Sequence, residues 1–169
     1  MNVRAVGAEP LSLADLTQIG RRYDLARANA GSVSTEGPDW QDRFTADDLL
    51  ETGGHLGMTT GPAAPAVVSS MERHVYTGEA LFCATGPVIL PVAPAGTLPR
   101  SVSARALLLR PGHVVVLLPG VWHAPCLGVH GATPYYWFAA VDDSVPTEWV
   151  DLDDGPIEVT QPEARAHVC

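Results

Sequence analysis

Glycine and proline divide the chain from His55 onward into short apolar runs. Nine such runs follow one another at spacings of about 8–12 residues, and none of them keeps the period of an amphipathic helix. Short strands at such regular spacing are typical of a β-sandwich or β-barrel. The sequence therefore predicts an all-β protein with strands within 55–60, 67–74, 79–83, 88–93, 104–109, 114–118, 122–129, 135–141 and 148–150.

Acidic side chains outnumber basic ones, with 19 Asp and Glu against 10 Arg, and the formal net charge is −9. A nucleic acid or an anionic membrane needs a basic surface, so neither is expected as a partner. The chain has no lysine, which excludes Schiff-base chemistry and a phosphate-binding P-loop.

No apolar run comes near the ~20 residues of a membrane span, and residues 1–10 lack the basic-then-apolar pattern of a signal peptide. The three cysteines form no CxxC pair, which argues against a disulfide framework and against a thiolate zinc site. We therefore expect a soluble, cytoplasmic protein.

Two helix-start patterns precede the strands. Ser12 with Asp15 makes one candidate capping box, and Thr45 with Asp48 makes a second. Residues 28–39 between them are small, polar and interrupted by glycine and proline, as in a loop. We predict a helical and loop segment that packs on the barrel, the β-barrel itself and an acidic tail, over 1–50, 51–150 and 151–169.

Four side chains that can bind a metal lie in or beside the predicted strands. Side chains alternate along a strand, so Glu72 and His74 project to the same side. Glu79 opens the next strand and can point back into the same space, and a Pro-Gly turn leads into His123. Imidazole with carboxylate suits zinc, nickel, iron or manganese and leaves positions open for a substrate. The predicted metal ligands are His74, Glu79 and His123, with Glu72 as a further ligand or a base.

The spacing of these residues resembles the paired motif of the cupin superfamily. The matching positions form two blocks, Glu72-x-His74-x4-Glu79-x6-Gly86 and Gly112-x7-Gly120-x2-His123. The chain departs from the motif in having Ala66 for the opening glycine, Glu72 for the first histidine, Leu118 for the proline and Leu127 for the final asparagine. The resemblance implies a single jelly-roll barrel of the cupin type.

A narrower resemblance is to the ureidoglycolate lyases. It rests on Met71-Glu72-Arg73-His74 followed by Glu79-Ala80-Leu81-Phe82, on Gly120-Val121-Trp122-His123-Ala124-Pro125, and on Pro10-Leu11-Ser12 near the start. The chain departs from that family in having Ala124 after the VWH block, Asp142-Asp143 for the usual Asp-Arg, and no recognisable Asn/Gly-rich segment within 28–39. The resemblance implies a homodimer that releases urea from ureidoglycolate to give glyoxylate, with nickel as the usual metal.

The chemistry that this resemblance implies assigns a role to each site residue. A metal held by His74, His123 and Glu79 would bind the carboxylate and hydroxyl of the small hydroxy-acid substrate. Glu72 would take the hydroxyl proton, and either water or a rim group such as Tyr136, in an aromatic strand, would protonate the departing urea nitrogen.

Two other functions are open at this point. One is another small-molecule metalloenzyme on the same barrel, such as an isomerase, a dioxygenase or a tailoring lyase. The other is a metal-free cupin that binds a metabolite, because Glu72 stands where the motif has a histidine.

Overall fold

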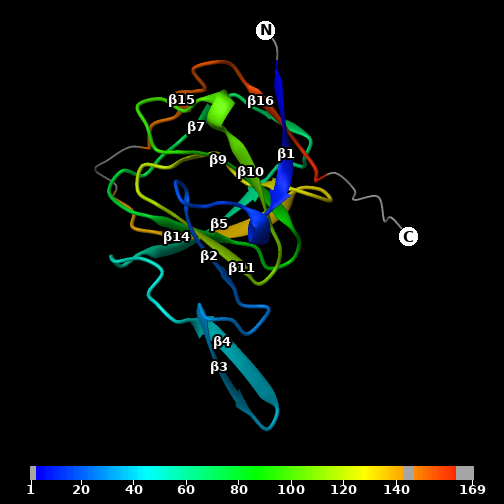
Figure 1. The fold of residues 1–169 in the computed structure, drawn as a ribbon, viewed down its shortest axis with the longest axis vertical. Helices are drawn as coiled ribbons and strands as arrows, with labels where there is room; N and C mark the ends of the chain where they lie inside the picture. Colours follow the sequence, from blue (N-terminus) through cyan, green and yellow to red (C-terminus); the bar gives the residue numbers. More distant parts are fainter. Residues whose placement is uncertain (1–2, 143–146, 163–169) are drawn as a thin grey trace.

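The structure is a computed structural model that describes residues 3–142 and 147–162. Two sheets form the body of the molecule, and a two-stranded hairpin extends away from it (Figure 1). The described residues contain two single-turn 3-10 helices, η1 (Leu11–Leu13) and η2 (Ser101–Ser103). They contain no helix that is long and apolar enough to cross a membrane.

The larger sheet has seven strands and curls into half of a barrel. Its order is β12-β9-β10-β1-β16-β6, and β13 lies beside β9. Strand β1 runs parallel to both of its neighbours, whereas the other pairs are antiparallel. The strands are β1 (Arg4–Pro10), β6 (Ala66–Val68), β9 (Val88–Ala93), β10 (Arg105–Leu109), β12 (Trp122–His123), β13 (Leu127–Gly128) and β16 (Ile157–Thr160).

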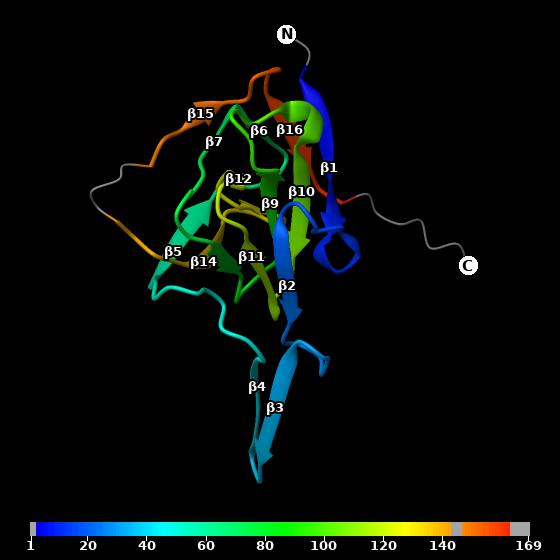
Figure 2. The same cartoon turned by 60° about the vertical axis from the view of Figure 1, so that its left-hand side comes forward.

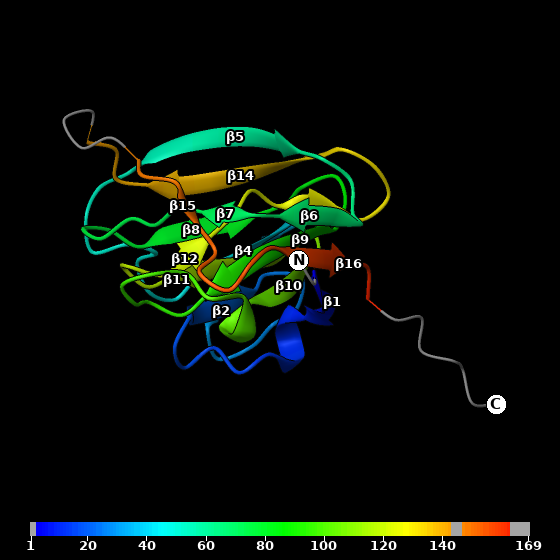
Figure 3. The same cartoon turned by 90° about the horizontal axis from the view of Figure 1, so that it is seen from above.

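The second sheet has five antiparallel strands in the order β2-β11-β8-β14-β5 (Figure 2). They are β2 (Gly20–Asp24), β5 (His55–Gly61), β8 (Glu79–Phe82), β11 (His113–Leu117) and β14 (Thr133–Ala139). Seen from above, β5 and β14 lie on the side of the molecule away from β1 (Figure 3). Two small sheets pair β7 (Ser70–Met71) with β15 (Val150–Asp151) and β3 (Ser32–Gly37) with β4 (Trp40–Thr45).

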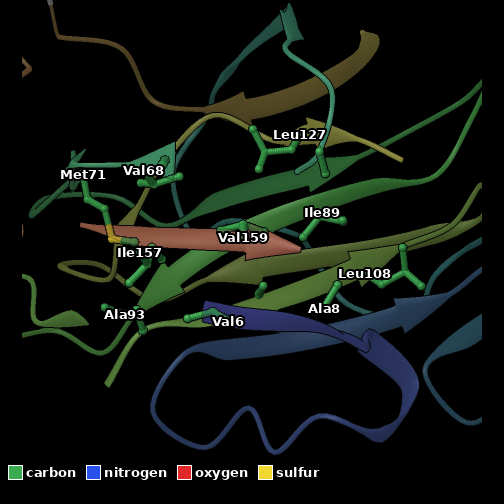
Figure 4. Close-up of a cluster of buried hydrophobic side chains, with 14 of the residues drawn as sticks. Val6, Ala8, Val68, Met71, Ile89, Ala93, Leu108, Leu127, Ile157 and Val159 are labelled. Atoms are coloured by element: carbon green, nitrogen blue, oxygen red, sulfur yellow. The ribbon is translucent and has the colours of Figure 1, made fainter. Parts of the chain in front are cut away.

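Every residue of β9 is buried, and so is every residue of β10 after Arg105, which is why 88–93 and 106–109 are continuously apolar. Alternate residues such as Leu90 and Leu107 pack between the two sheets against Leu81 and Val115 of the five-stranded sheet. The intervening residues pack inside the curl of the larger sheet. This second cluster is shown in Figure 4 and includes Val6, Val68, Met71, Ile89, Leu108, Ile157 and Val159.

The nearly all-β architecture with a curled half-barrel is consistent with the predicted cupin-like fold, but the predicted helical N-terminal segment is wrong. Strand β1 and η1 are followed by a turn, and β2 begins at Gly20. The carboxylate of Asp15 does not cap a helix, because it accepts hydrogen bonds from the Thr17 amide (3.0 Å) and hydroxyl (2.7 Å). Such local side-chain bonds stabilise a turn in competition with a helix.

The second predicted helix does not form either, and the predicted loop within 28–39 contains a strand. Residues 32–37 and 40–45 pair as a hairpin, so Thr45 ends a strand instead of starting a helix. The Thr45 hydroxyl donates to the carbonyl of Asp47 (2.8 Å), and the chain continues through bends to residue 54.

The segment after Asp151 contributes to the core. Leu152, Ile157 and Val159 are buried, and β16 lies between β1 and β6 in the larger sheet. The sheet thus takes strands from both sides of the predicted barrel range 51–150. Residues 163–169 of the predicted tail and Asp143 lie outside the described part of the chain.

Candidate functional site

The site is built on a backbone bridge between Glu72 and His123. The Glu72 amide donates to the His123 carbonyl and the His123 amide donates to the Glu72 carbonyl, at 2.9 Å each. Reciprocal bonds of this kind place two residues directly opposite each other with their side chains on the same side. Atom Nε2 of His123 lies 3.7 Å from Oε1 of Glu72.

A turn that contains Gly120 directs the chain into this bridge. The backbone of Gly120 has φ +83°, in the left-handed region that favours glycine. Its amide donates to the carbonyl of His74 (2.7 Å), so the turn is tied to the segment that carries the second histidine. The cupin-type spacing between Gly120 and His123 thus has a structural reason.

Glu79 begins β8 and is opposite Leu117 and Ala139 in the two neighbouring strands, so its side chain points between the sheets. Oxygen Oε2 of Glu79 lies 2.8 Å from Nε2 of His123 and 3.6 Å from Nε2 of His74. The two imidazole rings are 5.3 Å apart at their centroids. One carboxylate therefore contacts both histidines.

The structure brings all four predicted ligands together. Glu72 and His74 point into the same space, as the alternation predicted, although His74 lies beyond the end of β7. Glu79 and His123 are buried, whereas Glu72 and His74 are partly exposed and face the cavity described below. The buried pair thus forms the floor of the site, and the other two residues form its accessible side.

Burial and neighbouring charges shift the proton affinity of two of these groups. Burial raises the pKa of the Glu72 carboxyl above its ordinary value, although the nearby His123 and His74 act in the opposite direction. Burial lowers the pKa of His123, but the hydrogen bond and charge of Glu79, with the charge of Glu72, outweigh it and leave that pKa raised. Glu72 is therefore a carboxylate that accepts a proton more readily than a solvated one.

The donor set fits a divalent metal ion. One ligand atom each from Glu72, His74 and His123 lie within 4.8 Å of one another. Ligand atoms that are each about 2.1 Å from one ion lie roughly 3–4 Å apart, and the nitrogen–oxygen distances of 2.8, 3.6 and 3.7 Å agree with this. Imidazole with carboxylate is a donor set that nickel, zinc, iron and manganese accept.

A cavity of about 420 Å³ opens over these residues. Glu72, His74 and Glu79 form part of its wall, and β14 contributes Trp137 and Ala139. Its remaining lining residues are Thr52, Thr59, Arg73, Val75, Tyr76, Thr77, Ala140, Val141, Asp142 and Thr147. A cavity of this size accommodates a small metabolite.

Arg73 is the one arginine among the described residues that line this cavity. Its guanidinium lies over the ring of Trp122, 4.3 Å from the centroid, and donates to the carbonyl of Gly96 (2.6 Å). The indole nitrogen of Trp122 donates to the same carbonyl (3.1 Å). Two partners thus hold the arginine in place, and guanidinium has further donors that these contacts do not use.

The catalytic position predicted for Tyr136 has no support in the structure. Tyr136 lies opposite Phe82 in the sheet and its ring stacks on that of Phe82, with centroids 5.6 Å apart. Residues alternate along β14, so Trp137 and Ala139 face the cavity and Tyr136 faces the other side of the sheet. The face of β14 that lines the cavity is identified by the pairing of Ala139 with Glu79, which is a contact of the tertiary structure and not a sequence pattern.

The two buried cysteines are not reactive thiolates. Burial raises the pKa of Cys83 to about 11 and raises that of Cys126 well above its ordinary value. Cys126 is fully buried near Glu79, whose charge adds to the effect. A protonated thiol is neither a nucleophile nor a metal ligand, so packing explains both residues.

A comparison with known protein families covers the residues of this site. The sequence model of the family described as ureidoglycolate lyase matches residues 12–160, which is most of the chain. The match includes every residue of the site described above. No curated protein matches the chain.

Proposed function

This chain belongs to the ureidoglycolate lyase family, and from that premise we propose that it cleaves ureidoglycolate to urea and glyoxylate in a metal-dependent reaction. Family membership makes it an enzyme, a lyase that releases urea. The observation that carries the finer proposal is the convergence of Glu72, His74, Glu79 and His123 at one end of a cavity large enough for a small hydroxy acid.

We assign the metal to His74 and His123, with Glu79 and Glu72 as the carboxylates that complete or support its coordination. When bound, a divalent metal supplies a positive charge that lowers the pKa of a substrate hydroxyl and stabilises the resulting alkoxide. Nickel is the metal that the family resemblance implies. Glu79 has a second role, because its contact with both imidazoles holds their Nε2 atoms toward the same point.

Glu72 is the proposed proton carrier. It takes the proton from the substrate hydroxyl, the oxygen lone pair forms the carbonyl of glyoxylate, and the carbon–nitrogen bond breaks with its electrons on the urea nitrogen. Glu72 then returns the proton to that nitrogen. One group can serve both atoms because hydroxyl and nitrogen are bonded to the same carbon, and its raised pKa suits a group that must both accept and release a proton.

Arg73 is the proposed partner of the substrate carboxylate. It is held at the cavity wall by Trp122 and Gly96, with guanidinium donors left over for a ligand. A guanidinium matches the geometry of a carboxylate better than an ammonium group does. The chain has Asp142-Asp143 where the family usually has Asp-Arg, so Arg73 supplies a charge that this departure removes.

The test is release of urea and glyoxylate from ureidoglycolate by the metal-reconstituted protein, with the His123→Ala variant measured alongside to subtract spontaneous decay. His113→Ala is the matched control. His113 is the first residue of β11, whereas Leu117, which pairs with Glu79 of the site, is the last residue of that strand. We expect release that requires His123 and does not require His113. Release no faster than spontaneous decay in all three proteins would contradict the proposed substrate.

A further inference from the structure

One wall of the cavity is a tryptophan side chain that no step of the proposed reaction uses. Trp137 lies in β14, two residues before Ala139, on the face of the strand that lines the cavity. Ala139 is opposite Glu79, so Trp137 and Glu79 are diagonal neighbours in the sheet, which are typically about 7–8 Å apart. Trp137 is therefore within reach of a small ligand held at the candidate metal site.

The indole of Trp137 lies across Gly57 of β5. Gly57 is opposite Trp137 in the sheet, and a Cβ atom at this position would collide with three carbons of the indole ring. A glycine inside a strand marks such a close approach, because any other residue would push the ring away. The ring also packs against the buried cluster that includes Leu81. Two neighbouring strands thus support the indole in a fixed position.

The part of this indole that the protein leaves uncovered borders the cavity. Trp122, the other tryptophan beside the site, is 1% exposed and lies under the guanidinium of Arg73, whereas Trp137 is partly exposed and lines the cavity directly. Trp122 belongs to β12 of the larger sheet and Trp137 to β14 of the five-stranded sheet. Arg73 and Trp137 therefore meet the cavity from the sides of different sheets.

The side chains next to the indole leave it accessible. Thr59 lies two residues after Gly57 along β5, and Ala139 lies two residues after Trp137 along β14, so both flank the ring on the cavity face. Both side chains are small and neither is charged. This wall suits a flat, uncharged part of a ligand, whereas the wall with Arg73 suits an anionic part.

We propose that Trp137 is a specificity-determining residue, on which the planar ureido group of the substrate stacks. The inference rests on the proposed function, because it takes ureidoglycolate as the substrate. Carboxylate, hydroxyl and ureido group are bonded to one carbon of that molecule, so they diverge from it in three directions. The carboxylate meets Arg73, the hydroxyl meets Glu72 and the candidate metal site, and the ureido group meets the indole.

This arrangement gives the cavity a reason to prefer a ureido compound. A planar group gains a large contact area on an aromatic ring, and an indole supported by the backbone of β5 loses little conformational freedom when a ligand binds. A hydroxy acid without a planar substituent makes the contacts with Arg73 and Glu72 but leaves the ring uncovered. Trp137 thus discriminates between substrates that share the same reacting end.

The experiment compares two ligands that each lack one part of ureidoglycolate. N-Carbamoylglycine keeps the carboxylate and the ureido group but has no hydroxyl, so it is not cleaved by the proposed route. Glycolate keeps the carboxylate and the hydroxyl but has no ureido group. Isothermal titration calorimetry on the metal-reconstituted protein measures both dissociation constants. Trp137→Leu is expected to weaken binding of N-carbamoylglycine about 3- to 10-fold and to leave glycolate binding unchanged, whereas Trp137→Phe, which keeps a ring, should retain most of the affinity.

A second variant moves the indole without removing it. Gly57→Ala places a methyl group where the ring lies, so it should also weaken binding of N-carbamoylglycine selectively. Trp40 and Gly37 of the β3–β4 hairpin repeat the same arrangement away from the cavity, because a Cβ atom at Gly37 would collide with the Trp40 indole. Trp40→Leu and Gly37→Ala are therefore the matched controls, and neither should change the binding of either ligand. Thermal unfolding of each variant shows whether it is folded.

The outcomes separate this inference from the proposed reaction. Unchanged affinity for N-carbamoylglycine in both Trp137→Leu and Gly57→Ala overturns the role of Trp137, and so does an equal loss of affinity for both ligands. A wild-type protein that binds glycolate but not N-carbamoylglycine overturns it as well. Failure of the proposed function is a different result, in which the wild type releases no urea from ureidoglycolate above spontaneous decay.

Discussion

Glu72 and His123 exchange two backbone hydrogen bonds of 2.9 Å, and this isolated bridge holds the candidate metal site together. It joins the residue that follows β7 to the last residue of β12, which is only two residues long. Because the two residues face each other directly, their side chains project to the same side and would hold one ion together with His74.

The most direct consequence of this geometry is that the metal content of the protein should depend on His123. His123 contributes a fully buried imidazole that no neighbouring nitrogen can replace, so His123→Ala is expected to lose at least tenfold in metal affinity. The measurement is metal content by mass spectrometry after dialysis of folded protein. Unchanged content in His123→Ala, beside an equally loaded His113→Ala control, would remove His123 from the ligand set.

Metal binding is expected to release a proton from His123. Its pKa is raised above the ordinary value, so the imidazole holds a proton over a wider pH range, and a metal must displace that proton to bind. The affinity should therefore fall as the pH falls through this raised pKa. Calorimetric titration in two buffers of different ionisation enthalpy measures the proton release. Binding heats that are independent of the buffer would contradict the displacement.

The rate should depend on pH through Glu72. Its carboxyl must be ionised to accept the substrate proton, and burial raises its pKa, so activity is expected to fall with decreasing pH at a higher pH than an ordinary glutamate near ~4.3 would cause. Glu72→Gln should lower kcat by about 10²–10⁴-fold and abolish this acidic limb. The exposed Glu158→Gln is the control. A Glu72→Gln enzyme with the wild-type pH profile would show that another group carries the proton.

Arg73 should act on substrate binding more than on the chemical step. Loss of a charge-assisted hydrogen bond to a carboxylate costs about 1.5–3 kcal/mol, so Arg73→Gln is expected to raise KM roughly 10-fold or more with a smaller change in kcat. Arg100→Gln makes the same change of charge at an exposed position outside the cavity. Equal KM values in the two variants would mean that Arg73 only supports Trp122.

Stability should depend on the C-terminal strand. Ile157 is fully buried in the curl of the larger sheet, and Ile157→Ala is expected to lower the free energy of unfolding by about 2–5 kcal/mol. Its neighbour Glu158 points to solvent, and Glu158→Ala should stay within about 0.5 kcal/mol. Urea denaturation of both variants provides the comparison. A difference below 1 kcal/mol between them would argue that β16 is not part of the cooperative fold.

The sequence predicted the strands best where local pattern and burial agree. The runs at 88–93 and 104–109 are apolar except at the partly buried Arg105, because both of their faces are covered, and they form β9 and β10 almost to the residue. The two helix-start patterns failed because a capping box describes only a few residues. At Asp15 the same carboxylate stabilises a turn, and at Thr45 pairing with β3 takes precedence.

By itself, the sequence determined the all-β class and the four residues of the candidate metal site, because strand periodicity and ligand spacing are local properties of the chain. Only the tertiary structure decided which further residues line the cavity beside these four. Alternation along β14 is visible in the sequence, but which of its two faces meets Glu79 depends on register with β8, and this places Trp137 at the cavity and Tyr136 away from it. A shift of register by one residue would exchange the two faces, and the register is set by packing between strands distant in the chain.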